Sequence, residues 1–106
     1  MSQKITILYV TCADAAEARS IGRALVEERL AACANIIPGM ESIYRWKGEI
    51  TSSGEVVLIV KTTHSMAQTC AGRIRERHSY EIPCVLPFDI DGVNNPFADW
   101  VSGEVR

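Results

Sequence analysis

The chain has 106 residues and a formal net charge of −2, which predicts one compact domain over residues 1–106 that buries a core without a disulfide or metal staple. The mixed charges exclude the clustered basic face of a nucleic-acid-binding protein, and no apolar run is long enough to cross a membrane. Residues Met1 to Lys4 show no secretory signal pattern, so we expect a cytoplasmic, reducing setting.

The first predicted elements are a buried strand and a capped helix. Ile5 to Val10 is a short, apolar, β-branched run, as found in buried strands. Asp14 and Glu17 have the spacing of a capping box, in which an acidic N-cap accepts helix amides and a glutamate three residues later reaches back. Apolar residues then recur at helical spacing, so we expect a helix that ends near Leu30.

A long hairpin is predicted next. The chain from Cys33 to Trp46 is extended, with an interruption at Pro38–Gly39. A turn at Lys47–Gly48 sends it back into a strand that contains Val56 to Val60. Large apolar side chains near the tip favour an assembly arm over a reaction site. The predicted oligomer-interface residues are Ile43, Tyr44 and Trp46.

The second half of the chain repeats the strand and helix order. Ser65 and Gln68 have the spacing of a second capping box, and Cys84 to Ile90 is the last long strand. Asn95–Pro96 predicts an N-cap followed by proline at the start of a short terminal helix. The stripe of the middle helix is predicted to contain Ala67, Cys70, Ile74 and His78.

The order β-α-β-β-α-β predicts an α+β fold, a ferredoxin-like sandwich with a long central hairpin and a short C-terminal helix. Two helices cover only one face of its four-stranded sheet. The runs Ile5 to Val10 and Val56 to Val60 do not alternate, which is typical of strands covered on both faces. Apolar area left in water forfeits roughly 25 cal/mol per Å². Another copy of the chain is the simplest cover, so the sequence predicts an oligomer.

The four cysteines form no recognisable motif. None belongs to a C-x-x-C pair, which argues against a zinc knuckle or a thioredoxin-type site. We expect free thiols, and free cysteine often behaves as a small buried hydrophobe. The cysteines are Cys12, Cys33, Cys70 and Cys84.

Four segments, spread over most of the chain, carry a family resemblance. They are Leu30 to Gly39 (LAACANIIPG), Ser42 to Gly48 (SIYRWKG), Val60 to Thr62 (VKT) and His78 to Pro83 (HSYEIP). In this order and spacing they resemble the CutA family of divalent-cation tolerance proteins. The resemblance implies a ferredoxin-like subunit, a homotrimer similar to PII signalling proteins, a cytoplasmic bacterial setting, and an association with tolerance to copper and other divalent metals.

The chain departs from the family at the expected metal site. Members with a metal-binding cysteine at the end of the first strand read roughly Cys-Thr-x-Pro, where this chain has Val10 and Ala13 at the cysteine and proline positions. Cys12 lies two residues beyond Val10 and shares its face only if the strand continues through it. The further departures are Ser79 for a proline, Cys84 for a glutamate and Phe97 for a tyrosine.

His78 and Cys12 remain the candidate metal ligands. Neutral imidazole suits copper and zinc, and a nearby thiolate favours Cu(I). The alternative is that His78 closes its helix and hydrogen-bonds a carbonyl. His64, just before Ser65, is interpreted as a loop residue. No cofactor is required, and the expected ligand is Cu(II), Cu(I) or another divalent metal ion.

A second group of residues is a candidate for a ligand cleft. Lys61 ends an apolar strand and Glu81 begins the run into the next one, so they form either a structural ion pair or the polar floor of a cleft between subunits. Tyr44 and Trp46 are either interface anchors or stacking platforms. The cleft candidates are Lys61, Tyr80, Glu81 and Trp46.

Three classes of function remain. The first is a trimeric protein of metal tolerance that binds copper weakly. The second is a PII-like signalling trimer that binds a small anionic ligand between subunits, although a glycine-rich phosphate loop is missing; Lys61, Arg75 or Arg77 would supply charge. The third, an enzyme, is disfavoured because no nucleophile, base and orienting group form a recognisable set. We therefore expect no enzyme, and as partners only the chain itself and a metal ion.

Overall fold

The computed structural model describes residues 3–106. Met1 and Ser2, which belong to the segment in which the sequence shows no secretory signal pattern, lie outside the described residues. The elements are β1 (Ile5–Cys12), α1 (Ala15–Glu27), β2 (Cys33–Trp46), β3 (Glu49–Thr63), a 3-10 turn (His64–Met66), α2 (Ala67–Arg77), β4 (Val85–Ile90) and α3 (Asn95–Glu104). The strands form one sheet in the order β2-β3-β1-β4, and neighbouring strands are antiparallel. This confirms the predicted ferredoxin-like α+β fold with its long hairpin and C-terminal helix.

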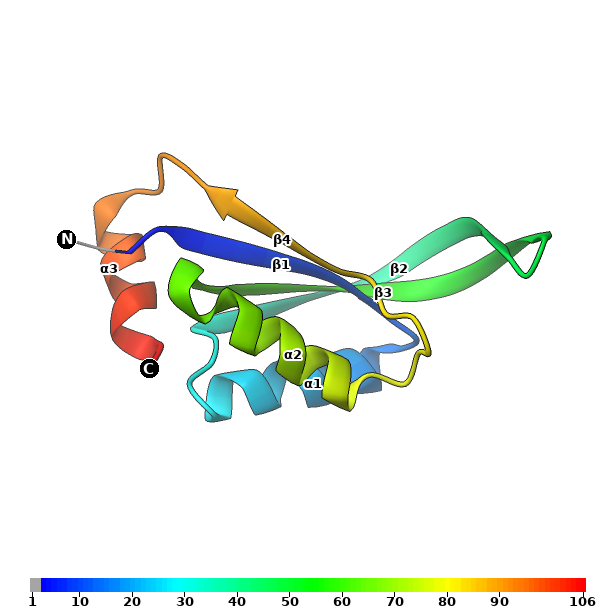
Figure 1. Ribbon diagram of the computed structural model, residues 1–106, viewed down its shortest axis with the longest axis horizontal. Helices are drawn as coiled ribbons and strands as arrows, with labels where there is room; N and C mark the ends of the chain where they lie inside the picture. Colours follow the sequence, from blue (N-terminus) through cyan, green and yellow to red (C-terminus); the bar gives the residue numbers. More distant parts are fainter. Residues whose placement is uncertain (1–2) are drawn as a thin grey trace.

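The helices α1 and α2 lie on one face of the sheet and enclose the main core (Figure 1). Alternate residues of β1 and β3 point into this core because successive strand side chains point to opposite faces. Leu8, Leu58 and Val60 are fully buried there. From the helices, Ile21, Leu25 and Ile74 pack against them. Burial of each such side chain stabilises the fold by about 1.5–3 kcal/mol.

The other face of the sheet is only partly covered. The short helix α3 lies across one end of the sheet (Figure 1), where Ala98 and Val101 pack against Ile5. Beyond α3 this face keeps large apolar side chains in water: Ile37 is 50% exposed, Leu86 46% and Phe88 52%.

The hairpin of β2 and β3 projects beyond the opposite end of the sheet as an arm (Figure 1). Its inner part pairs Ile37 with Val57, and its outer part pairs Met40 with Glu55. Pro38 and Gly39 together therefore oppose a single residue of β3, which makes a β-bulge with one extra residue in β2. Gly39 has φ +85°, a left-handed conformation that glycine adopts without strain.

The first predicted capping box forms with one change. The carboxylate of Asp14, the N-cap of α1, accepts a hydrogen bond from the Glu17 N–H at 2.8 Å. The Glu17 carboxylate reaches back to the N–H of Ala13 at 3.0 Å, one residue before the N-cap. The helix ends at Glu27, three residues short of the predicted Leu30, because the chain turns at Arg29 with φ +58°.

Two predicted helix starts are wrong in detail. Ser65 does not cap α2: it lies inside the 3-10 turn, and its hydroxyl donates to the Gln3 side chain at 2.6 Å. The N-cap of α3 is Asn94, so Asn95 is already helical. In residues 3–106, no helix combines the length and the apolar character needed to cross a membrane.

Candidate functional site

Three metal-binding side chains meet where β1, α1 and α2 end or begin. Cys12 is the last residue of β1, Glu17 is in the first turn of α1, and His78 follows α2 directly. Their ligand atoms all lie within 4.8 Å of one another, and no other such group of three occurs among residues 3–106. The sequence paired Cys12 with His78 as candidates but did not include Glu17, which it treated only as a capping residue.

His78 is held by hydrogen bonds at both ring nitrogens. Its Nε2 lies 2.8 Å from the carbonyl oxygen of Thr11, and its Nδ1 lies 3.1 Å from the backbone nitrogen of Tyr80. A carbonyl only accepts and a backbone N–H only donates, so this network assigns the proton to Nε2. The side chain is fully buried. The geometry agrees with the alternative in which His78 closes its helix and bonds a carbonyl.

Glu17 links the start of α1 to the loop after α2. One carboxylate oxygen accepts the Ala13 N–H at 3.0 Å, and the other accepts the Ser79 N–H at 2.8 Å. Burial acts to raise the pKa of Glu17, but these hydrogen bonds outweigh it, so the pKa lies below the ordinary value. Glu17 is therefore an ionised carboxylate at neutral pH.

Cys12 is fully buried beside that negative charge. Burial is the main cause that raises the pKa of the Cys12 thiol to about 12, and the nearby Glu17 carboxylate adds to the effect. The thiol is therefore protonated at neutral pH. Thiolate, and not thiol, is the form that binds metals.

The three donors fit a copper or zinc ion by their chemistry. Imidazole suits both metals and sulfur favours Cu(I). Two features of the metal-free site oppose binding of an ion, however. The Cys12 thiol must lose its proton, and the hydrogen bond from the Tyr80 N–H to the His78 Nδ1 must break. A metal ion would bind here only at the cost of these interactions.

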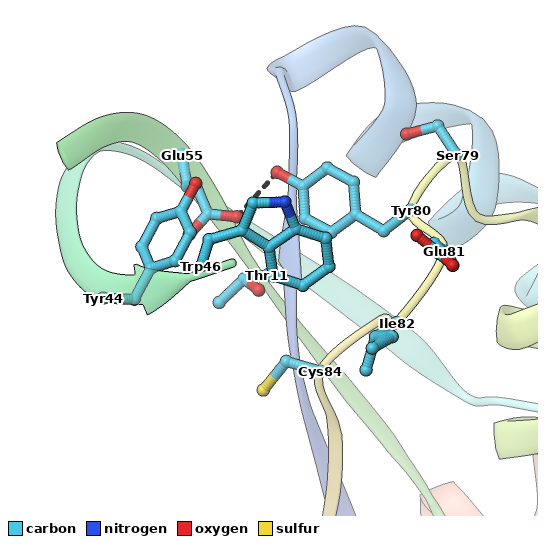
Figure 2. Close-up of a pocket in the computed structure, with 9 residues that line it drawn as sticks. All are labelled: Thr11, Tyr44, Trp46, Glu55, Ser79, Tyr80, Glu81, Ile82 and Cys84. Carbon is cyan, nitrogen blue, oxygen red and sulfur yellow. Dashed lines mark hydrogen bonds between the residues drawn. The ribbon is translucent and has the colours of Figure 1, made fainter. Parts of the chain in front are cut away.

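A pocket of about 440 Å³ lies on the open face of the sheet, near this group. Figure 2 shows hairpin side chains facing the loop between α2 and β4, with Thr11 and Cys84 near them. Thr11 joins the two sites, because its carbonyl accepts from His78 and the residue also lines the pocket. The lining residues are Thr11, Tyr44, Trp46, Glu55, Ser79, Tyr80, Glu81, Ile82 and Cys84.

The bulge at Pro38–Gly39 determines which arm residues face the pocket. Paired residues of antiparallel strands share a face. Beyond the bulge, β2 residues with even numbers pair with odd-numbered residues of β3, so Tyr44 and Trp46 lie on the same face as Glu55. If the pairing of Ile37 with Val57 continued along the same sequence without a bulge, Tyr44 and Trp46 would lie on the opposite face.

Tyr80 and Glu55 form the central contact of the pocket. The Tyr80 hydroxyl donates to the Glu55 carboxylate at 2.6 Å (Figure 2). Burial and then this hydrogen bond raise the pKa of the Tyr80 phenol. The His78 ring packs behind it, with ring centroids 4.7 Å apart. The loop wall of the pocket is therefore fixed from both sides.

The structure brings three of the four cleft candidates together, namely Tyr80, Glu81 and Trp46. Lys61 is elsewhere, with its Nζ 5.6 Å from the centroid of the Phe97 ring on α3. Lys61 and Glu81 form no ion pair within the described residues.

Sequence reasoning missed Glu55 as a pocket residue. The one feature of the sequence that could have indicated Glu55 is its position, as an acidic residue directly before the apolar run that starts at Val56. His64, interpreted as a loop residue, is exposed in the 3-10 turn and lies 3.0 Å from the Asp89 carboxylate.

Comparisons with known proteins agree with one another. The family model described as CutA1 divalent ion tolerance protein matches residues 6–104. The divalent-cation tolerance protein CutA of Thermus thermophilus is 41% identical over 95 residues, which are 90% of this chain and 92% of that protein. The crystal structure of CutA1 from Oryza sativa superposes with a TM-score of 0.95 at 30% identity, covering 99% of this chain and 96% of that one.

The predicted cytoplasmic setting is overturned by these comparisons. The CutA protein of Arabidopsis thaliana, 33% identical over 100 residues, is described as chloroplastic. A similar structure from Archaeoglobus fulgidus, with a TM-score of 0.93 at 32% identity over 96% of this chain and 99% of that one, is described as periplasmic. The same domain therefore occurs in different compartments, and its composition does not determine the compartment. The chain spans 55% of the length of the Arabidopsis protein.

Proposed function

Since the chain belongs to the family of CutA1 divalent ion tolerance proteins, we propose that it contributes to tolerance of divalent metal ions by binding copper weakly at Cys12, Glu17 and His78. The observation that carries this proposal is the approach of the three ligand atoms to within 4.8 Å of one another. The relatives are named as tolerance proteins and not as enzymes.

Weak binding follows from the interactions that copper must displace. A structural metal site keeps its ligands deprotonated and free of other partners. Here the Cys12 thiol is protonated and the His78 Nδ1 accepts a backbone N–H. Loss of a hydrogen bond of this kind costs about 0.5–1.5 kcal/mol. These costs reduce the affinity without blocking the site.

A calorimetric titration of the reduced protein with Cu(II) tests the proposal. We expect saturable binding that disappears in His78→Ala and persists in His64→Ala, which removes the chain's other histidine. Thiols are counted before and after, because Cu(II) oxidises them. Equal binding by all three proteins would mean that copper does not bind at His78.

We also propose that the working form is a homotrimer. The open face of the sheet carries Ile37, Leu86 and Phe88 in water, and the arm carries the exposed side chains Ile43 and Ile50. Apolar area of this kind is what subunit interfaces bury. Contact with other copies of the chain would remove the apolar side chains of both the sheet face and the arm from water.

The lining of the pocket does not support the alternative function, in which the protein binds a small anionic ligand. Its lining contains Glu55 and Glu81 and no lysine or arginine. Lys61, Arg75 and Arg77, which the sequence offered as sources of positive charge, are not among the lining residues. Two carboxylates repel an anion.

A further inference from the structure

The pocket between the arm and the α2–β4 loop combines aromatic rings with negative charge. Tyr44, Trp46 and Tyr80 contribute three rings, and Glu55 and Glu81 contribute two carboxylates. A volume of about 440 Å³ is typical of sites for small molecules. The combination of rings and carboxylates complements one class of ligand, since both attract a cation.

Glu55 carries a charge that the protein does not neutralise. Its side chain is half-buried, and its Oε2 accepts the Tyr80 hydroxyl. Among residues 3–106, neither Glu55 nor Glu81 has a lysine, arginine or histidine within ion-pair distance. A partly desolvated carboxylate is costly when it is not paired. Its second oxygen is left to accept from a ligand.

The aromatic rings provide the second attraction. Tyr44 and Trp46 are 41% and 40% exposed in the isolated chain, so their rings are accessible there. The indole of Trp46 already has a cation near it, because the Lys47 Nζ lies 5.9 Å from the ring centroid. Ring faces attract ammonium and guanidinium groups, most strongly where the cation is partly removed from water.

We propose that this pocket binds a small organic cation, with an alkylammonium or guanidinium head between the aromatic rings and the Glu55 carboxylate. The ring faces contribute cation–π attraction and not metal coordination. Within the described chain, the one group of three metal ligands is Cys12, Glu17 and His78, none of which lines the pocket. The pocket therefore shares no ligand side chain with the copper site, although its residues Thr11 and Tyr80 contact His78.

Fluorescence of Trp46 gives a direct readout. The chain has two tryptophans, and a Trp100→Phe reference protein leaves Trp46 as the only one. This protein is titrated with butylammonium, and in parallel with 1-butanol as the matched neutral molecule, in the presence of a chelator. We expect saturable binding of butylammonium, and binding of 1-butanol at least about tenfold weaker, because hydrogen bonds between charged groups are stronger than those of a neutral hydroxyl.

Charge at Glu55 is tested in the same reference protein. Glu55→Gln keeps an acceptor for Tyr80 and removes the charge, so we expect butylammonium to bind about tenfold more weakly. Glu41→Gln is the matched control, because Glu41 lies on the opposite face of the same arm and does not line the pocket. We expect it to leave binding unchanged.

Any of three results would overturn the proposal. The first is equal binding of butylammonium and 1-butanol, and the second is equal binding of butylammonium before and after Glu55→Gln. The third is a change in molar mass on Glu55→Gln, measured by light scattering, together with no ligand binding to the reference protein. That third result would mean that a basic side chain of another copy occupies the pocket.

Discussion

Glu17 connects parts of the chain that are 62 residues apart in sequence. Its carboxylate holds the N–H of Ser79, directly after His78, and the N–H of Ala13, directly after Cys12. The proposed ligands His78 and Cys12 are therefore each followed directly by a residue whose backbone N–H is hydrogen-bonded to Glu17. Glu17 therefore positions the site even where no metal is bound.

Stability should depend on pH through Glu17. Its pKa in the folded protein is lowered from the ordinary value of 4.5, so the stabilisation is present above pH 4.5 and is lost as the pH falls through the lower folded-state pKa. Glu17→Gln should cost about 1–3 kcal/mol at pH 7, because hydrogen bonds to charged groups are lost. Its unfolding midpoint in urea should fall less than that of the native sequence between about pH 5 and pH 3.

Glu27→Gln is the control for this measurement. Glu27 is exposed at the end of the same helix, where its carboxylate lies 3.7 Å from the Arg23 guanidinium. A surface pair of this kind contributes little to stability, so we expect Glu27→Gln to keep the pH profile of the unmodified protein. A parallel pH profile for Glu17→Gln and the unmodified protein would contradict the role of the Glu17 charge.

The sequence predicted single residues well where the interaction is local. Asp14 caps α1 as its spacing with Glu17 indicated. Both interpretations of His78 were stated, and the hydrogen bond to a carbonyl is present at Thr11. The bond from Ser79 to Glu17 could not be predicted, because a backbone N–H leaves no pattern in the sequence that identifies a distant acceptor.

At the scale of elements, two similar patterns had different outcomes. Asp14 is extended, as an N-cap must be, and its helix starts directly after it. Ser65 also precedes a helix, but the chain leaves β3 through a 3-10 turn that contains it, and its hydroxyl bonds Gln3 instead. A capping pattern is therefore a weak predictor of a helix start where another turn can form between the strand and the helix.

The bulge in β2 should depend on Gly39. Its φ of +85° is unfavourable for residues with a Cβ, although a Cβ there would meet no atom within 4 Å. Gly39→Ala should therefore destabilise the protein by about 1–2 kcal/mol through backbone strain alone. The measurement is the unfolding midpoint in guanidinium chloride.

Gly54→Ala is the matched control for the bulge. Gly54 lies across from Glu41 in the same arm, has equal space for a Cβ, and has no positive φ. Alanine there should be neutral or slightly stabilising, because it restricts the unfolded chain. Equal destabilisation by both substitutions would argue against a role for the left-handed backbone.

At the scale of the whole molecule, the uncovered sheet face and the arm should determine the assembly. Light scattering at micromolar concentration should report close to three times the monomer mass. Ile43→Ser should raise the concentration at which the assembly dissociates by about tenfold or more, because burial of an isoleucine contributes about 1.5–3 kcal/mol. Ile43 is 72% exposed in the isolated chain and does not line the pocket.

A monomer at micromolar concentration would contradict the proposed trimer. An assembly that dissociates at the same concentration with and without Ile43→Ser would place the interface elsewhere. The sequence indicated the need for cover because β1 and β3 do not alternate. It could not predict α3 as partial cover, since the contact of Val101 with Ile5 joins the two ends of the chain.

The extra residue at Pro38–Gly39 makes the arm tolerant of one deletion and sensitive to two. Removal of one residue at the bulge would leave a single β2 residue opposite Val56, so Met40 would still pair with Glu55, and Tyr44 and Trp46 would keep their side. Removal of two would shift the outer pairing by one residue in a regular ladder, so that Ile43 and Arg45 would take that side. A relative shorter by one residue at this point can therefore keep the same surface, whereas one shorter by two would present a different surface with the same amino acids.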